Sequence, residues 1–238
     1  MKMDIKPELI NTKLLPPYSL ADLVERPRLM GLFARTERQK ATILTAPAGY
    51  GKTVAMVQFA AAAKKPLVWY QLDQYDNDPT VFFQYLIAGL DRHFFDFGRG
   101  ILPLVAQGAA PRLLLAAFIN GLEKKAKGGL TLALDDYHQI TEPTVHDFLQ
   151  ELLQNITDGI HIVIASRAPV PLLLSRSVML GEVHVAGSEE LRFDRREIKT
   201  FLSRQNKQLS EDTLRTVEHQ TAGWPVVLRL IGESASGV

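Results

Sequence analysis

The 238-residue chain contains no cysteine, which excludes disulfide bridges, cysteine-ligated zinc, iron–sulfur clusters and thiol nucleophiles. It also lacks an excess of charge of either sign, because 27 lysines and arginines stand against 26 acidic residues. The formal net charge of +1 supplies no field that would hold a polyanion such as DNA. We therefore expect no direct DNA contact by this chain, and the absence of cysteine fits a reducing cytoplasm.

Long apolar runs are missing as well. The N-terminal stretch MKMDIKPELI carries Asp4 and Glu8 where a secretory signal needs uninterrupted apolar residues. No later segment approaches the roughly 18 apolar residues of a membrane span. None of the six histidines pairs with another at metal-ligand spacing on a predicted helix, and the G-x-S-x-G elbow of serine hydrolases does not occur. We expect a cytoplasmic chain without membrane contact.

The composition is that of a folded globular chain, with 46% hydrophobic and 22% charged residues. Short apolar runs alternate with longer helical patterns, which is typical of a parallel sheet covered by helices on both faces. Several of the runs are apolar almost throughout, as strands buried on both faces require. The expected strands span residues 42–46, 67–72, 130–134, 160–165 and 183–186.

Apolar residues at helical spacing predict core-facing helices between these strands. After residue 188 the strand signals stop, and short helices with polar faces follow. Asp194 and Glu197 form a candidate capping pair for the first of them. Further helices are expected from Ser210 and from Pro225, whereas residues 232–238 have the composition of a linker. The core-facing stripes are Phe82, Tyr85, Leu86, Gly89 and Leu90; Leu114, Ala117, Phe118, Gly121 and Leu122; and Val145, Phe148, Leu149, Leu152 and Leu153.

The segment APAGYGKT, residues 46–53, follows the first strand and opens a helix. Its glycines let backbone N–H groups converge on phosphate oxygens, and the helix N-terminus adds partial positive charge. Lys52 can reach the β and γ phosphates, and Thr53 can ligate Mg²⁺. The segment departs from G-x-x-x-x-G-K-[ST] only at Ala46, and the alternative is a tight turn with an exposed lysine. The predicted nucleotide contacts are Ala48, Gly49, Tyr50, Gly51, Lys52, Thr53 and Val54.

Acidic and basic residues follow two further strands. Asp135 ends an apolar run and is the candidate carboxylate for the metal, at the tip of a strand that neighbours the phosphate loop. Asp136 could polarise a water molecule aimed at the γ phosphate, although both acids could instead form a turn or cap a helix. Arg167 follows the next strand and could sense or neutralise the γ phosphate, or pair with a surface carboxylate.

The ordered set TAPAGYGKT, YQLDQYDND at 70–78, LALDDYH, IVIASR and the late GWP at 223–225 resembles the ATP-binding domain of MalT-like transcriptional activators. These are LuxR-type regulators of the STAND class of signalling NTPases. The resemblance runs from Arg26 to Leu230. With the patterns above, it predicts an α/β three-layer P-loop NTPase with a mostly parallel sheet over residues 1–187. A small helical appendage over 188–231 and a linker-like tail over 232–238 complete the expected organisation.

The resemblance implies that the chain binds ATP or ADP with Mg²⁺, and that slow ATP hydrolysis acts as a switch. ADP would hold an inactive monomer, and ATP would drive self-association and DNA binding through regions absent from these 238 residues. The partners implied are the nucleotide, other domains of a longer regulator and further copies of the chain. The alternatives are a stand-alone P-loop ATPase or phosphotransferase, and an interaction scaffold with a vestigial site.

Residue by residue, the resemblance assigns Lys52 and Thr53 to phosphate and Mg²⁺, and Arg167 to nucleotide sensing. It also assigns Asp135 and Asp136 to the metal and the attacking water. The stretch 26–29, with Arg26 and Arg28, would lie near the adenine, and Pro225 would contact the nucleotide. Alternatively, the two arginines are solvated residues at a helix start, and 223–225 is a helix stop and restart with a buried Trp224. Asp73, Asp76 and Asp78 are best explained as an acidic turn that caps the next helix.

Overall fold

The computed structural model describes residues 9–17, 23–36, 39–62, 65–204 and 210–234. Its centre is a five-stranded parallel sheet in the order β2–β3–β4–β1–β5. The five predicted strands are confirmed, each within one residue at either end, and so is the α/β fold class. The strands are β1 (Ala41–Thr45), β2 (Leu67–Gln71), β3 (Leu130–Asp135), β4 (Ile160–Ser166) and β5 (Val183–Ala186).

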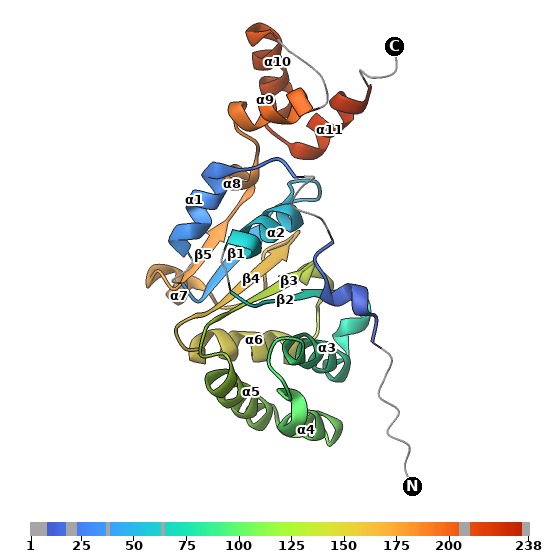
Figure 1. The fold of residues 1–238 in the computed structure, drawn as a ribbon, viewed down its shortest axis with the longest axis vertical. Coiled ribbons are helices and arrows are strands. Elements are labelled where there is room, and N and C mark those ends of the chain that lie inside the picture. Colours follow the sequence, from blue (N-terminus) through green and yellow to red (C-terminus); the bar gives the residue numbers. More distant parts are fainter. Residues whose placement is uncertain (1–8, 18–22, 37–38, 63–64, 205–209, 235–238) are drawn as a thin grey trace.

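Helices cover the sheet on both faces (Figure 1). The helices α1 (Pro27–Thr36) and α2 (Lys52–Ala62) lie on one face. On the other face lie α3 (Pro79–Asp91) and α6 (Pro143–Asn155), with α4 (Leu102–Ala106) and α5 (Pro111–Lys125) outside them. The short elements are η1 (Asn11–Leu14), η3 (Gln74–Asn77), η4 (Gly98–Gly100), η5 (Tyr137–Gln139), α7 (Ser175–Met179) and α8 (Ser188–Leu191).

The chemistry of the strands explains this layering. Along β4, Ile162 and Ile164 face the α3 and α6 layer, whereas Val163 and Ala165 face the α1 and α2 layer. All seven residues of β4 and all six of β3 are buried. Strands that are buried on both faces need no alternation of polar and apolar residues, as the sequence predicted.

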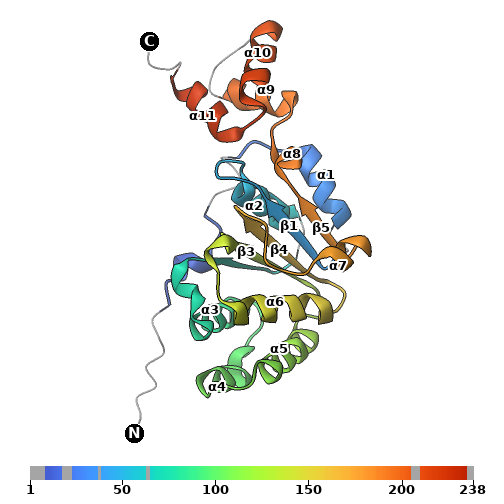
Figure 2. The same cartoon turned by 180° about the vertical axis from the view of Figure 1, so that it is seen from behind.

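The helical appendage stands at one end of the sheet domain, past β5 (Figure 2). It consists of α9 (Arg195–Arg204), α10 (Glu211–Thr221) and α11 (Pro225–Ser234). A capping box confirms the predicted start of α9: the Glu197 amide donates to Asp194 Oδ1 at 2.8 Å and the Asp194 amide to Glu197 Oε2 at 2.9 Å. The three helices share a small core of their own, made of Ile198, Leu202, Leu214, Val217 and Leu228.

Helix α11 continues to Ser234, so the helix takes in the first residues of the segment predicted as a linker-like tail. Residues 235–238 of that tail and the N-terminal residues 1–8 lie outside the described residues. Within the described ranges, every helix is too short or too polar to cross a bilayer.

The acidic turn after β2 contains more than helix caps. Asp73 and Asp78 cap η3 and α3 as predicted, but Asp76 is fully buried. Its carboxylate accepts hydrogen bonds from Lys13 Nζ at 2.6 and 2.8 Å and from the Tyr70 hydroxyl at 2.7 Å. This buried ion pair holds η1 against the end of β2. It joins residues 63 positions apart, so no local sequence pattern could predict it.

Removing one partner of the Lys13–Asp76 pair should be strongly destabilising, because it leaves a buried charge without a partner. Lys13→Met should lower the free energy of unfolding by about 3–5 kcal/mol, measured by urea denaturation. Arg99→Met is the matched control: its 3.4 Å pair with Asp96 is exposed, so the loss should stay under about 1 kcal/mol. Equal, small losses in both variants would contradict the structural role of Lys13.

Candidate functional site

The loop between β1 and α2 has the backbone of a phosphate site. Gly49 and Gly51 have φ values of +81° and +74°, in the left-handed region that side chains disfavour. Among the described residues, the N–H groups of Gly49, Tyr50 and Gly51 have no hydrogen-bond acceptor. The carbonyl oxygens of residues 46–49, in contrast, all accept hydrogen bonds. The loop thus presents free N–H groups beside the N-terminus of α2, an arrangement that binds anions.

Lys52 is the first residue of α2, and its side chain folds back across this loop. Its Nζ donates to the carbonyl oxygens of Ala46 at 2.7 Å and Pro47 at 2.9 Å. Burial lowers the pKa of the Lys52 ammonium, and the nearby Arg167 charge lowers it further. An anion bound in the loop would offset both effects.

Asp135, the last residue of β3, is 1% exposed and next to Thr53. Its Oδ1 accepts a hydrogen bond from the Asp136 amide at 2.9 Å. The buried Oδ2 has no hydrogen-bond partner among the described residues. Burial raises the pKa of Asp135 to about 6, against the opposing effect of the Thr53 hydrogen bond. An orphaned carboxylate oxygen beside a hydroxyl is an oxygen set that fits Mg²⁺.

One expectation about Asp135 was wrong. Its strand β3 does not neighbour β1, because β4 lies between the two. Strand order is set by long-range packing, so the sequence could not supply it. Strand β4 pairs with β1, which leads into the phosphate loop. Arg167 directly follows β4 and therefore lies beside that loop.

Asp136 lies at the same edge and has a left-handed backbone, with φ of +55°. Its Oδ1 is 3.8 Å from Arg167 Nε and 3.7 Å from His138 Nδ1. Burial lowers the pKa of His138, and the Asp136 charge opposes that shift. The partner of Arg167 is therefore a carboxylate of the candidate site itself.

Two adjoining cavities meet at the loop and share Gly49, Gly51 and Val54. The first, of about 320 Å³, has polar walls. The second, of about 560 Å³, has mostly apolar walls and lies between the sheet domain and the helical appendage. The first is also lined by Pro17, Ala48, Lys52, Thr53, Gln71, Asp135, Asp136 and Arg167. The second is also lined by Leu23, Val24, Arg26, Phe193, Phe201, Pro225, Val226 and Arg229.

Arg26, Arg28 and Pro225, the predicted nucleotide contacts outside the phosphate loop, lie in different places. Pro225 and Arg26 line the apolar cavity. Arg26 is not solvated: it is 1% exposed and pairs with Glu197 of α9 at 3.3 Å. Arg28 lines neither cavity and donates instead to the carbonyl oxygens of Glu190 and Arg192 at 2.9 and 2.7 Å. A nucleotide contact by Arg28 therefore has no support from its position.

Two contacts on the phosphate loop were missed from sequence. Trp224 is not buried in the appendage; its indole N–H donates to the Ala48 carbonyl at 3.2 Å, and its ring stacks on Tyr50 with centroids 5.7 Å apart. The Val226 amide donates to the Gly49 carbonyl at 3.2 Å. The GWP motif signalled a turn, but only the packing of the appendage shows what that turn contacts.

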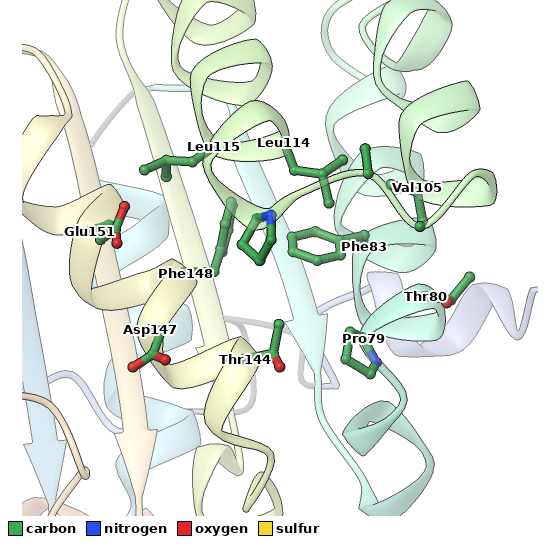
Figure 3. A pocket seen from close by; sticks show the side chains of 13 residues that line it. Pro79, Thr80, Phe83, Val105, Leu114, Leu115, Thr144, Asp147, Phe148 and Glu151 are labelled. Atoms are coloured by element: carbon green, nitrogen blue, oxygen red, sulfur yellow. The ribbon is translucent and has the colours of Figure 1, made fainter.

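A further hollow, of about 290 Å³, lies in the opposite layer, between α3, α5 and α6. Phe83, Leu114 and Phe148 form its apolar walls (Figure 3). None of the predicted site residues lines it. The candidate site is therefore the pair of cavities at the phosphate loop.

No protein-family model matches the chain. It is 32% identical over 233 residues to the HTH-type transcriptional regulator MalT of Serratia proteamaculans, covering 95% of this chain and 25% of that protein. The MalT regulator of Cronobacter sakazakii is 31% identical over 230 residues, with the same coverage. The chain spans about a quarter of the length of these relatives.

Two solved structures share the fold. One is a signal transduction ATPase with numerous domains and a tetratricopeptide repeat sensor from Pyrococcus horikoshii, with a TM-score of 0.58 at 17% identity, covering 89% of this chain and 30% of that one. The other is a Walker-type ATPase of Pyrococcus abyssi, with a TM-score of 0.58 at 14% identity, covering 94% of this chain and 70% of that one.

The raised pKa of Asp135 makes a prediction about stability. Folding raises the pKa of Asp135 from 3.8 to about 6. The unfavourable free energy of the buried charge is therefore absent below pH 3.8, grows between pH 3.8 and pH 6, and is complete above that range. Without metal, Asp135→Asn should therefore raise the free energy of unfolding by about 3 kcal/mol at pH 8 and change it little near pH 4. Urea denaturation in a chelating buffer measures both values.

Asp147→Asn serves as the control, because this exposed carboxylate should leave stability unchanged at either pH. A destabilised Asp135→Asn variant at pH 8 would contradict the cost assigned to the buried charge.

Proposed function

We propose that this chain, a homologue of part of the MalT transcriptional regulators with the fold of the P-loop ATPases, is an ATP- and ADP-binding signalling domain. It works as a nucleotide-gated switch with slow ATP hydrolysis. The switch controls multimerisation and DNA binding by regions outside this sequence. The chain spans about a quarter of the length of these relatives, so multimerisation and DNA binding are proposed for a longer protein and not for this chain alone.

The observation that carries the proposal is the pair of cavities joined at the phosphate loop. One is polar and holds the cationic and acidic side chains, and the other is apolar. A nucleotide has the same division, with charged phosphates at one end and a flat, largely apolar base at the other. The phosphates would occupy the 320 Å³ cavity and the base the 560 Å³ cavity.

The residues that line the polar cavity include candidates for each task at the phosphates. Lys52 and the loop N–H groups bind the β and γ phosphates, and Thr53 and Asp135 hold Mg²⁺, which neutralises phosphate charge when bound. Asp136 orients the attacking water, and Arg167 senses the γ phosphate. The Asp136 carboxylate lies 3.8 Å from the Arg167 guanidinium, which favours its charged form.

The apolar cavity offers the means of switching, since its walls come from two parts of the chain. Val54 belongs to the sheet domain, whereas Phe193 and Pro225 belong to the appendage side. A ligand that contacts both parts can favour one arrangement over another, provided that ATP and ADP bind the arrangements with different affinity. In this proposal Arg26 and Pro225 stand beside the adenine.

Lys52→Ala tests nucleotide binding directly. Removing a charged donor to phosphate should weaken ADP and ATP binding by about tenfold to a hundredfold, measured by isothermal titration calorimetry. Lys124→Ala, an exposed lysine on α5, keeps the same change in net charge and should bind like the unmodified chain. Unaltered affinity in Lys52→Ala would remove this residue from the site, and no binding by the unmodified chain would end the proposal.

A further inference from the structure

We infer that Trp224 and Val226 are positioning residues for the phosphate loop, and that they couple phosphate binding to the docking of the helical appendage. The inference rests on the proposed function, because it concerns how that same site is regulated. It assigns Trp224 no contact with the nucleotide. Its role is to hold two peptide groups of the loop by their carbonyl ends while the N–H ends face the phosphates.

The hydrogen bonds that carry the inference lie on consecutive peptide groups. The Trp224 indole N–H donates to Ala48 O, and the Val226 amide donates to Gly49 O, each at 3.2 Å. The N–H groups on the other sides of these two peptide groups belong to Gly49 and Tyr50. Neither has an acceptor among the described residues.

The planar trans peptide connects the two ends. All peptide bonds of the described residues are trans. In a trans peptide group the C=O and the N–H point in opposite directions. The carbonyl oxygens of Ala48 and Gly49, which accept from Trp224 and Val226, therefore face the appendage, while the N–H groups of the same two peptide groups face away from it. Hydrogen bonds in such a chain polarise one another, so a donor at the oxygen strengthens the N–H as a donor to phosphate. By the same reasoning, a phosphate on the N–H strengthens the oxygen as an acceptor for Trp224.

The packing around these bonds leaves little freedom. A Cβ on Gly49 would come within 2.5 Å of Val226 Cγ1, so the loop and α11 are in direct contact. Gly223 has a left-handed φ of +72°, and a Cβ there would lie 2.2 Å from the Phe193 carbonyl oxygen. Phe193 in turn donates its N–H to Gly223 O at 2.8 Å. The turn that directs Trp224 onto the loop is thus fixed by its own backbone contacts.

The coupling is reciprocal by thermodynamic necessity: if docking of the appendage strengthens phosphate binding, phosphate binding strengthens docking by the same factor. This separates the inference from a purely structural role for Trp224. Adenosine, which reaches the apolar cavity without phosphates, should not produce the effect, whereas ADP should.

Trp224→Phe tests the first half, because it removes the indole N–H and keeps an aromatic ring for Tyr50. Losing one such hydrogen bond should raise the dissociation rate of a fluorescent ADP analogue about three- to tenfold in stopped-flow chase experiments. Trp69→Phe is the matched control: Trp69 is 1% exposed in the sheet domain, and its indole nitrogen has no partner among the described residues. That variant should release the analogue at the original rate.

Acrylamide quenching of Trp224 fluorescence tests the second half, in the Trp69→Phe variant where Trp224 is the sole tryptophan. ADP should reduce the quenching constant and adenosine should not. If ADP binds but Trp224→Phe releases it at the original rate, or if quenching is the same with ADP and without it, the coupling is refuted while the nucleotide site stands. If ADP does not bind to the unmodified chain, the proposed function and the coupling both fail.

Discussion

The conformation of one short loop determines how the rest of the site is arranged. Left-handed glycines at 49 and 51 turn the N–H groups of the loop to one side and its carbonyl groups to the other. The N–H groups of residues 49–51 have no acceptor among the described residues, whereas the carbonyl groups accept hydrogen bonds from Lys52, Trp224 and Val226. The N–H side that would bind an anion and the carbonyl side that contacts the appendage therefore belong to the same backbone, which is the basis of the coupling proposed above.

The charges around this loop are held at a cost. Burial lowers the pKa of Lys52 and raises that of Asp135, so each charged form is less stable than in water. Bound phosphate and a divalent cation would relieve both costs at once, since each would supply the opposite charge. The site is thus built from groups whose electrostatics are incomplete in the protein alone. Perturbed groups that gather at a cleft in this way are typical of functional sites.

The sequence predicted the sheet well because burial on both faces favours strands that are apolar almost throughout: runs such as LTLALD and IHIVIAS lack strict polar alternation. It also predicted the phosphate loop, since glycine spacing, Lys52 and Thr53 are local features. It could not predict strand order, which places β4 between β1 and β3. The Lys13–Asp76 pair and the Trp224 contact with Ala48 join residues 63 and 176 positions apart, beyond the reach of any local pattern.

The central claim is that ATP and ADP favour different arrangements of the sheet domain and the helical appendage. The chain has no cysteine, so spin labels can be attached at Lys124→Cys on α5 and Asp212→Cys on α10, both exposed positions. Pulsed electron paramagnetic resonance then measures the distance between them at saturating nucleotide with Mg²⁺. The account predicts different distance distributions with ADP and with a slowly hydrolysed ATP analogue. Identical distributions with both nucleotides bound would contradict it.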